Sequence, residues 1–198
     1  MSSPTRWAGV PLNDRRAERR GRLVAAAFAL FGEGGESAVS VRSVCRECGL
    51  NTRYFYESFG SVDELLGAVF DDVAGQLRAT VETAMTDAGP SLRARIRAGV
   101  SAVLSFTSED PRRGRLLVTD ARTNPVLLAR RAATQALMLE TAIAEDGRLH
   151  PEGDPVQARV GAAMYTGAVA ELSQQWLAGT LGTDLDAVVD HALRIMLR

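Results

Sequence analysis

Residues 40–59 read SVRSVCRECGLNTRYFYESF, and this stretch decides the fold. Ser40 is a residue type that caps helix N-termini, and Gly49 supplies the sharp break that ends the helix begun there. Asn51 is an equally good cap for a second short helix. The sides of these helices that face inward carry Val41, Val44, Cys45, Cys48, Phe55 and Phe59. The stretch therefore predicts two short helices joined by a tight turn that contains glycine.

Helical signals continue on both sides of this stretch. Over residues 15–33, upstream, apolar residues recur at helical spacing and the pattern ends at a run of glycines. Ser61 followed by Glu64 has the spacing of a capping box, which predicts a long helix that runs to about Thr86. No strand-like alternation is long enough to compete with these signals, so the predicted fold class is all-α.

The rest of the chain contains three helix starts of one type, in which an acidic or amide cap precedes proline at the first helical position. These starts are Asp110-Pro111, Asn124-Pro125 and Asp154-Pro155. The predicted helices cover residues 91–108, 111–121, 125–146 and 155–179, and a last one runs from residue 184 to the end with Thr183 as its cap. About nine helices result. We expect residues 1–60 to form a domain with a basic N-terminal arm, and residues 61–198 to form a second helical domain.

The composition of the 198 residues excludes several classes of protein. All 23 basic residues are arginine, so a P-loop lysine or a Schiff-base lysine is absent. The longest strictly apolar run, residues 23–31, is far too short to cross a bilayer. Residues 1–22 lack the apolar core and cleavage site of a signal peptide. We therefore expect a cytoplasmic protein with no membrane partner.

The net charge of −1 hides an asymmetry along the chain. Residues 1–60 carry nine arginines against six acidic residues, whereas the remainder carries fourteen against eighteen. Within residues 1–22 the ratio is six to two, which makes the N-terminus a basic arm. This distribution favours a polyanionic partner for the first domain.

Two short helices around a glycine-containing turn have the spacing of a helix-turn-helix, whose second helix lies in a DNA major groove. The outward side of that helix carries Arg53, which can pair bidentately with guanine. Arginines within residues 15–22 are candidates for phosphate contacts. The alternative is a solvated basic face. The predicted DNA-binding residues are Arg42, Ser43, Asn51, Thr52, Arg53, Tyr54 and Tyr56.

Residues 22–69 resemble the N-terminal domain of the TetR family of bacterial transcriptional regulators. The resemblance is carried by an Ala-, Phe- and Leu-containing run before a glycine, a small-residue helix that ends at Gly49-Leu50, the Tyr56-x-x-Phe59 pair and the Ser61-x-Asp63 start of the fourth helix. It implies a homodimer that binds a palindromic double-stranded DNA operator, usually as a repressor. It also implies that a small-molecule effector in the C-terminal domain releases the DNA. We expect no cofactor.

The same resemblance implies roles for individual residues of the second short helix. Tyr56 falls where the family commonly places a phosphate-contacting tyrosine, and residues 52–54 fall on its base-reading positions. Three departures from the family pattern stand out. Asn51 replaces the usual Ser or Thr cap, Val62 stands where a phosphate-binding lysine is frequent, and an Arg-Tyr pair replaces a common Gly-Thr pair. The last change prevents the operator from being inferred from relatives.

Cys45 and Cys48 form a C-x-x-C pattern, which also occurs at redox and metal sites. The TetR-like pattern fills both positions with alanine, so we interpret them as small buried hydrophobic residues. A structural zinc site would need two more ligands, and His150 and His191 lie in distant segments. We therefore predict no metal site, and a thiol-based redox switch remains the alternative.

The last two predicted helices carry apolar stripes at helical spacing. Two such helices per subunit can form a four-helix bundle between subunits, as the resemblance implies. Periodicity alone does not distinguish such a bundle from packing within one chain. The predicted dimer-interface residues are Met164, Ala168, Trp176, Leu185, Val189 and Leu193.

A ligand cavity is expected among the fourth to eighth predicted helices. Apolar lining with Gln135 or Tyr165 as a polar handle favours a mostly apolar ligand. The alternative is that each lining residue is plain core. The predicted ligand-binding residues are Phe70, Leu77, Val103, Phe106, Gln135, Met138 and Tyr165.

Two other classes of function compete with a regulator. An enzyme is disfavoured because no nucleophile-elbow, zinc-protease, di-metal or dinucleotide-binding motif is present, and we predict no catalytic residues. A helical ligand-binding or protein-interaction module without DNA binding is suggested by Glu57 on the second short helix and by Val62. Activation instead of repression also stays open, because the sequence says more about DNA binding than about the sign of the response.

Overall fold

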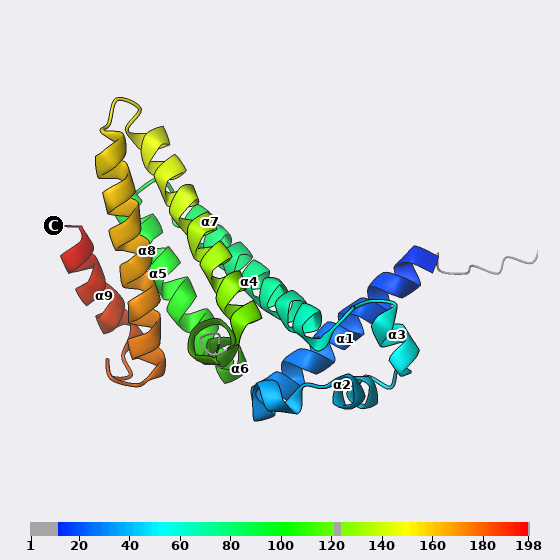
Figure 1. Ribbon diagram of the computed structural model, residues 1–198. Coiled ribbons are helices and arrows are strands. Elements are labelled where there is room, and N and C mark those ends of the chain that lie inside the picture. The colour runs from blue at the N-terminus through cyan, green and yellow to red at the C-terminus, as the bar shows by residue number, and fades with distance from the viewer. Residues whose placement is uncertain (1–11, 121–123, 198) are drawn as a thin grey trace, which may run out of the picture. The chain divides into compact units, whose positions relative to one another are not determined.

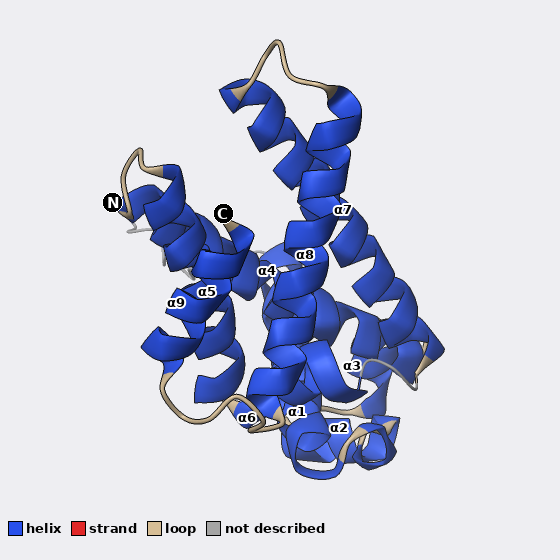
Figure 2. Ribbon diagram, turned by 90° about the vertical axis from the view of Figure 1, so that its left-hand side faces the viewer, coloured by secondary structure: helices blue, strands red, loops and turns tan. Residues whose placement is uncertain are grey.

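The computed structural model describes residues 12–120 and 124–197, so residues 1–11 of the basic arm lie outside the described residues. The described residues form nine α-helices and no strand (Figures 1 and 2), which confirms the all-α class. None of the described helices is both long enough and apolar enough to span a lipid bilayer. The chain divides into two compact units, of which the first ends at Val69 and the second begins at Phe70.

The first unit is built from three helices and the start of a fourth. Its elements are α1 (Leu12–Gly34), a 3-10 turn (Glu36–Ala38), α2 (Val41–Glu47), α3 (Thr52–Tyr56) and the first turns of α4 (Val62–Asp87). α2 packs against α1, and α3 contacts both. Its largest fully buried side chains are Leu23, Phe31, Phe55, Phe59, Leu65 and Leu66. The helices predicted on either side of Gly49 therefore surround a small apolar core.

Side-chain caps start the helices of this unit where the sequence predicts them. Ser40 Oγ accepts from the Ser43 backbone N–H at 3.1 Å, and Ser43 Oγ accepts from the Ser40 N–H at 2.9 Å. This reciprocal pair satisfies two N–H groups that the helix itself leaves unpaired. At the start of α4, Ser61 Oγ accepts from the Glu64 N–H at 3.1 Å, while the Glu64 carboxylate reaches back to the Gly60 N–H at 2.7 Å.

The second unit contains the rest of α4 and five more helices. Their bounds are α5 (Leu92–Glu109), α6 (Pro111–Gly114), a π-helical turn (Arg115–Thr119), α7 (Pro125–Leu149), α8 (Pro155–Leu177) and α9 (Leu185–Met196). The caps Asp110, Asn124 and Asp154 each accept a backbone N–H of the helix that they start, as predicted. α7 and α8 form a hairpin of neighbouring helices (Figure 1, yellow-green and orange).

Two details of the second unit differ from the sequence-based expectation. The helix predicted over residues 111–121 is α6, only four residues long, followed by the π-helical turn, and its expected end falls outside the described residues. In this turn the Arg115 guanidinium donates to Asp120, with Nη2 to Oδ2 at 2.8 Å. The wider π-helical turn brings residues five apart closer than an α-helix does. At α9, Asp184 rather than Thr183 is the cap, accepting from the Ala187 N–H at 3.0 Å.

The core of the second unit lies where α5 meets α9. Val100 and Leu104 of α5 pack with Val189 and Leu193 of α9, and none of the four is more than 1% exposed. Arg97 of α5 pairs at the edge of this cluster with two carboxylates of α9, those of Asp186 and Asp190. The amphipathic stripe of α9 is therefore covered by its own chain.

Gly114 marks a close approach within the second unit, and it generates a stability prediction. A Cβ atom there would lie 2.8 Å from the Thr107 carbonyl oxygen and 3.0 Å from both Cδ atoms of Leu177. Because a backbone oxygen cannot move aside cheaply, Gly114→Ala should lower the free energy of unfolding by about 1–3 kcal/mol. Gly147→Ala is the matched control, since a Cβ there meets no heavy atom within 4 Å. The control should be stabilising by about 0.5–1 kcal/mol.

Urea denaturation followed by circular dichroism measures both variants. Equal stability of Gly114→Ala and the wild type would contradict the close approach.

Candidate nucleic-acid interface

The turn between α2 and α3 depends on Gly49, whose φ is 64°. Residues with a Cβ rarely adopt this left-handed conformation. The following Leu50 N–H donates to the Cys45 carbonyl at 2.9 Å and so closes the end of α2. A Cβ at Gly49 would come no closer than 3.9 Å to Arg22, so the backbone conformation, not a shortage of space, requires glycine. The turn thereby sets where α3 begins.

α3 has one buried side and one exposed side, as its sequence predicts. Phe55 is fully buried, and Phe59, just beyond the helix, is 1% exposed. Asn51 caps the helix by accepting from the Arg53 N–H at 2.9 Å. The predicted DNA-binding residues Thr52, Arg53, Tyr54 and Tyr56 are all exposed, Tyr56 to 63%. The structure therefore brings the predicted base-reading residues together on one short surface.

Most of the arginines within residues 15–22 contact their own domain. Arg16 donates to the Glu57 carbonyl at 2.6 Å, and Arg22 donates to the Cys48 carbonyl at 2.5 Å. Arg19 and Arg20 stack over aromatic rings, at 4.7 Å from the Tyr54 centroid and 4.5 Å from the Phe59 centroid. These guanidinium groups fasten α1 to the ends of α2 and α3, a structural role that the sequence did not predict. Their contacts with phosphates stay a prediction. Arg15 alone of the cluster has no partner among the described residues.

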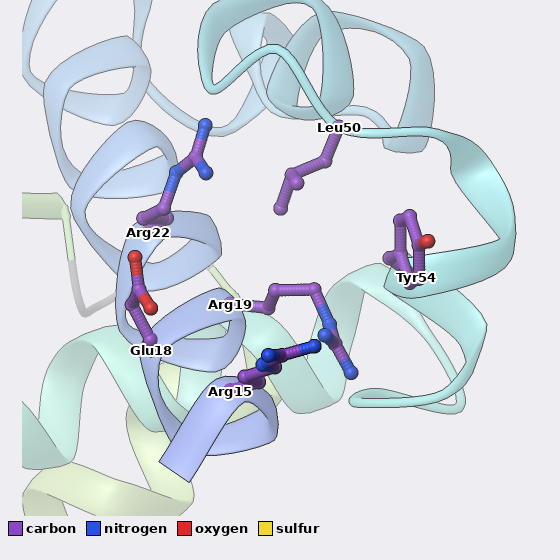
Figure 3. A pocket seen from close by; sticks show the side chains of 6 residues that line it. All are labelled: Arg15, Glu18, Arg19, Arg22, Leu50 and Tyr54. Carbon is purple, nitrogen blue, oxygen red and sulfur yellow. The ribbon is translucent and has the colours of Figure 1, made fainter. Parts of the chain in front are cut away.

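An open hollow of about 360 Å³ lies between α1 and the turn into α3 (Figure 3). Its lining consists of Arg15, Glu18, Arg19, Arg22, Leu50 and Tyr54. Figure 3 shows Arg19 extending from α1 toward Tyr54 while Leu50 points into the hollow from the opposite side. The Arg19 Nε atom is buried without a hydrogen-bond partner among the described residues. With three arginines and one carboxylate, the lining carries net positive charge.

The two predicted contacts on α2 differ in how free their side chains are. Arg42 is exposed, and its guanidinium has no partner among the described residues. The Ser43 hydroxyl serves the capping box and also donates to the Ala38 carbonyl at 2.8 Å. Ser43 therefore has a structural role that the sequence reading of a phosphate contact did not include.

Residues 23–69 match the family described as bacterial regulatory proteins, tetR family. The N-terminal domain belongs to the TetR family. This match confirms the resemblance drawn from the glycine turn and its flanking aromatic residues, and it covers both short helices, α2 and α3.

Three proteins are similar to this chain over about nine-tenths of its length. The chain is 28% identical over 185 residues to the HTH-type transcriptional activator FasR of Mycolicibacterium smegmatis. The matched region covers 90% of this chain and 81% of FasR. The transcriptional regulator FadR from Bacillus subtilis, solved with stearoyl-CoA, is similar with a TM-score of 0.73 at 17% identity, covering 89% of this chain and 96% of FadR. The fatty acid degradation regulator FadR from Bacillus halodurans gives a TM-score of 0.72 at 17% identity, covering 90% and 94%. These two structures share the TetR-like fold.

The cysteines of this TetR-family domain are free thiols on α2 and at its C-cap. Cys45 is 5% exposed, which agrees with the buried small residue predicted there. Burial raises the pKa of the Cys45 thiol, and the nearby Cys48 raises it further. Cys48 is only half-buried, so it departs from that prediction, and its S–H donates to the Cys45 carbonyl at 3.8 Å. Among the described residues, no group of three or more His, Cys, Asp or Glu residues is arranged to hold a metal ion.

The residues predicted to line a ligand cavity differ in how far the second unit buries them. Gln135 and Met138 are exposed on α7, so the expectation that they line an interior needs correction, because the chain leaves that side of α7 uncovered. The buried members of the set are Phe70, Leu77 and Phe106, and the partly buried ones are Val103 and Tyr165.

Tyr165 of α8 combines an interior position with an unused hydroxyl. It packs against the core that α5 and α9 share, and burial raises the pKa of its hydroxyl. That hydroxyl lies 3.6 Å from where a Cβ of Gly99 would be, and it makes no hydrogen bond with any described residue. Of the two polar residues predicted to contact a ligand, Gln135 and Tyr165, only Tyr165 therefore lies partly inside the second unit.

The predicted dimer residues also divide. Val189 and Leu193 are buried in the chain's own core, and Leu185 and Trp176 pack against that core. The prediction that Val189 and Leu193 lie on an intersubunit surface needs correction, because their own chain buries them. Trp176 and Leu185 are only partly buried, so their place at an interface stays a prediction. The two predicted residues nearer the middle of α8, Met164 and Ala168, are exposed, Met164 to 71%.

Proposed function

We propose that this TetR-family protein is a homodimeric repressor that binds a palindromic DNA operator and is released by a mostly apolar small molecule. The observation that carries the DNA-binding part is the exposed surface of α3, where an arginine, a threonine and a tyrosine project together from a helix held by a buried phenylalanine pair. Arginine pairs bidentately with guanine in the major groove, and tyrosine and threonine contact bases or phosphates.

The experiment that tests operator binding is selection of bound sequences from a random duplex pool, followed by titration of the best duplex against salt. An inverted repeat with a steep salt dependence supports a dimeric operator binder. A folded protein that enriches no sequence at low salt would instead support the alternative, a helical module without DNA binding.

The exposed face of α8 supports dimerisation. Val156, Val160 and Met164 follow one another at intervals of four residues and are 68%, 53% and 71% exposed. The next residue in this row, Ala168, is small and also exposed. Large apolar side chains that gather on one exposed face are typical of an interface. A second copy of the same face fits the need for two recognition helices on a two-half-site operator.

The effector is proposed to bind in the second unit with its polar group at Tyr165. A half-buried hydroxyl with an unused donor gives a mostly apolar ligand one fixed hydrogen bond. FadR from Bacillus subtilis was solved with stearoyl-CoA, which makes a long-chain acyl-CoA the probe to try first. A ligand that binds better to the conformation that does not fit DNA shifts the population away from the operator.

We propose that the protein lowers transcription when it binds its operator, and a promoter reporter tests this. Deletion of the gene should raise transcription from a promoter that contains the selected duplex. Because the relative FasR is described as an activator, a fall in transcription is the outcome that would replace repression with activation.

Arg53→Ala should weaken binding to the selected duplex by roughly 1–3 kcal/mol and relax base preference at one position of each half-site. Arg42→Ala is the comparison, because a phosphate contact weakens all sequences equally and lowers the salt slope by about one. Fluorescence anisotropy with labelled duplexes measures both. Unchanged binding by Arg53→Ala would contradict its position as a base-reading residue.

Met164→Glu should convert the dimer to a monomer, because a carboxylate buried in the apolar interface loses its hydration without gaining a partner. Leu137→Glu places the same charge on α7, where Leu137 is 53% exposed, and should leave the dimer intact. Sedimentation velocity distinguishes the two species. A dimer that survives Met164→Glu would argue against the α8 face.

Tyr165→Phe should raise the stearoyl-CoA concentration needed for DNA release about threefold to tenfold, since a net hydrogen bond contributes about 0.5–1.5 kcal/mol. Operator affinity without ligand should stay the same, because the phenyl ring preserves the packing. Titration of the preformed protein–DNA complex with stearoyl-CoA gives the measurement. Equal release of variant and wild type would remove Tyr165 from the effector site.

A further inference from the structure

Arg53 is highly exposed and yet one of its nitrogens is already engaged. Its side chain is 82% exposed, and its Nε donates to Glu57 Oε1 at 3.0 Å, one helical turn further along. Its two terminal nitrogens, Nη1 and Nη2, have no partner among the described residues. The guanidinium is thus held on one edge and open on the other.

Glu57 also contacts α1, closely through its backbone and at longer range through its carboxylate. The Glu57 carbonyl oxygen accepts from Arg16 at 2.6 Å. The second carboxylate oxygen of Glu57, Oε2, lies 3.9 Å from Arg19 Nη2. The Glu57 side chain is 37% exposed, so it lies at the edge of the domain core. Arg53 is therefore connected through Glu57 to the longest helix of the first unit.

The chemistry of guanine recognition matches this arrangement. Guanine presents two acceptors in the major groove, N7 and O6, and an arginine bonds both with two parallel N–H groups. With Nε occupied, the pair Nη1 and Nη2 is the edge that remains. Holding a long side chain in one rotamer before binding reduces the ordering that binding must impose. A carboxylate on a DNA-binding helix repels phosphates, and its other favourable use is to accept from the N4 amino group of cytosine. The bond to Arg53 already occupies one oxygen of Glu57.

We propose that Glu57 is a positioning residue that presents the terminal edge of Arg53 to one guanine of each half-site, and so determines base specificity there. The proposal rests on the proposed operator binding, with Arg53 as the base-reading residue. Glu57 acts through Arg53 and touches no base. Its removal therefore changes the preference for one base and leaves the other positions of the operator unaffected.

The test is a double-mutant cycle on the full-length protein with Arg53→Ala, Glu57→Ala and both changes together. The probes are the duplex selected by the wild type and the three duplexes that replace the base pair at which Arg53→Ala loses preference. The readout is the ratio of dissociation constants between these duplexes. Glu57→Ala should lower that ratio roughly threefold to tenfold, and it should have no further effect when Arg53 is already alanine.

Two more variants separate positioning from a general charge effect. Glu47→Ala removes a carboxylate that is exposed at the end of α2 and has no partner among the described residues, and it should leave the ratio unchanged. Glu57→Gln keeps an oxygen that can accept from Arg53 Nε and should retain at least half of the wild-type ratio. Thermal denaturation of each variant verifies that the domain is folded.

The outcomes distinguish this inference from the proposed function. If Glu57→Ala keeps the wild-type ratio of dissociation constants and binds every duplex more tightly by the same factor, Glu57 does not position Arg53. Operator binding would stand in that case. A Glu57→Gln variant as impaired as Glu57→Ala would also overturn it. A wild type that selects no sequence would overturn operator binding and this inference with it.

Discussion

The hydrogen bond from Arg16 of α1 to the carbonyl oxygen of Glu57 holds the end of a helix that is too short to persist alone. α3 has five residues, so its position depends on contacts with its neighbours. Phe55 and Phe59 supply the apolar contacts, and the left-handed turn at Gly49 sets where the helix begins. The exposed surface of α3 keeps its geometry only because these three constraints agree, and the DNA-binding role of the domain depends on that geometry.

The arginines of α1 show that one residue type serves two purposes in this domain. Arg22 satisfies the Cys48 carbonyl at the end of α2, while Arg19 and Arg20 cover aromatic rings of the α3 segment. Each planar guanidinium bonds or stacks in a fixed geometry, which a lysine ammonium does not reproduce. Positive charge is thus placed near the interface while much of its hydrogen-bonding capacity is used to fasten helices together.

Local signals in the sequence predicted the helix starts well, because a cap such as Asp110 or Asn51 acts on N–H groups two or three residues away. Properties that depend on distant partners were harder. The stripe of α9 has the same periodicity whether α5 or a second subunit covers it, so Val189 and Leu193 were misassigned. Composition likewise does not distinguish a solvated arginine from one that bonds a carbonyl. The exposed face of α3 was predictable because Phe55 and Phe59 define its opposite side.

The division between the units falls inside α4, and this limits how the protein can be recombined with others. Leu65, Leu66 and Val69 are fully buried and belong to the first unit, although they follow the residue where the domain boundary was expected from sequence. A chimera joined at residue 60 would replace these three core side chains with those of the foreign sequence that follows. A fusion of the first unit to another sensor domain must therefore include the start of α4 through Val69.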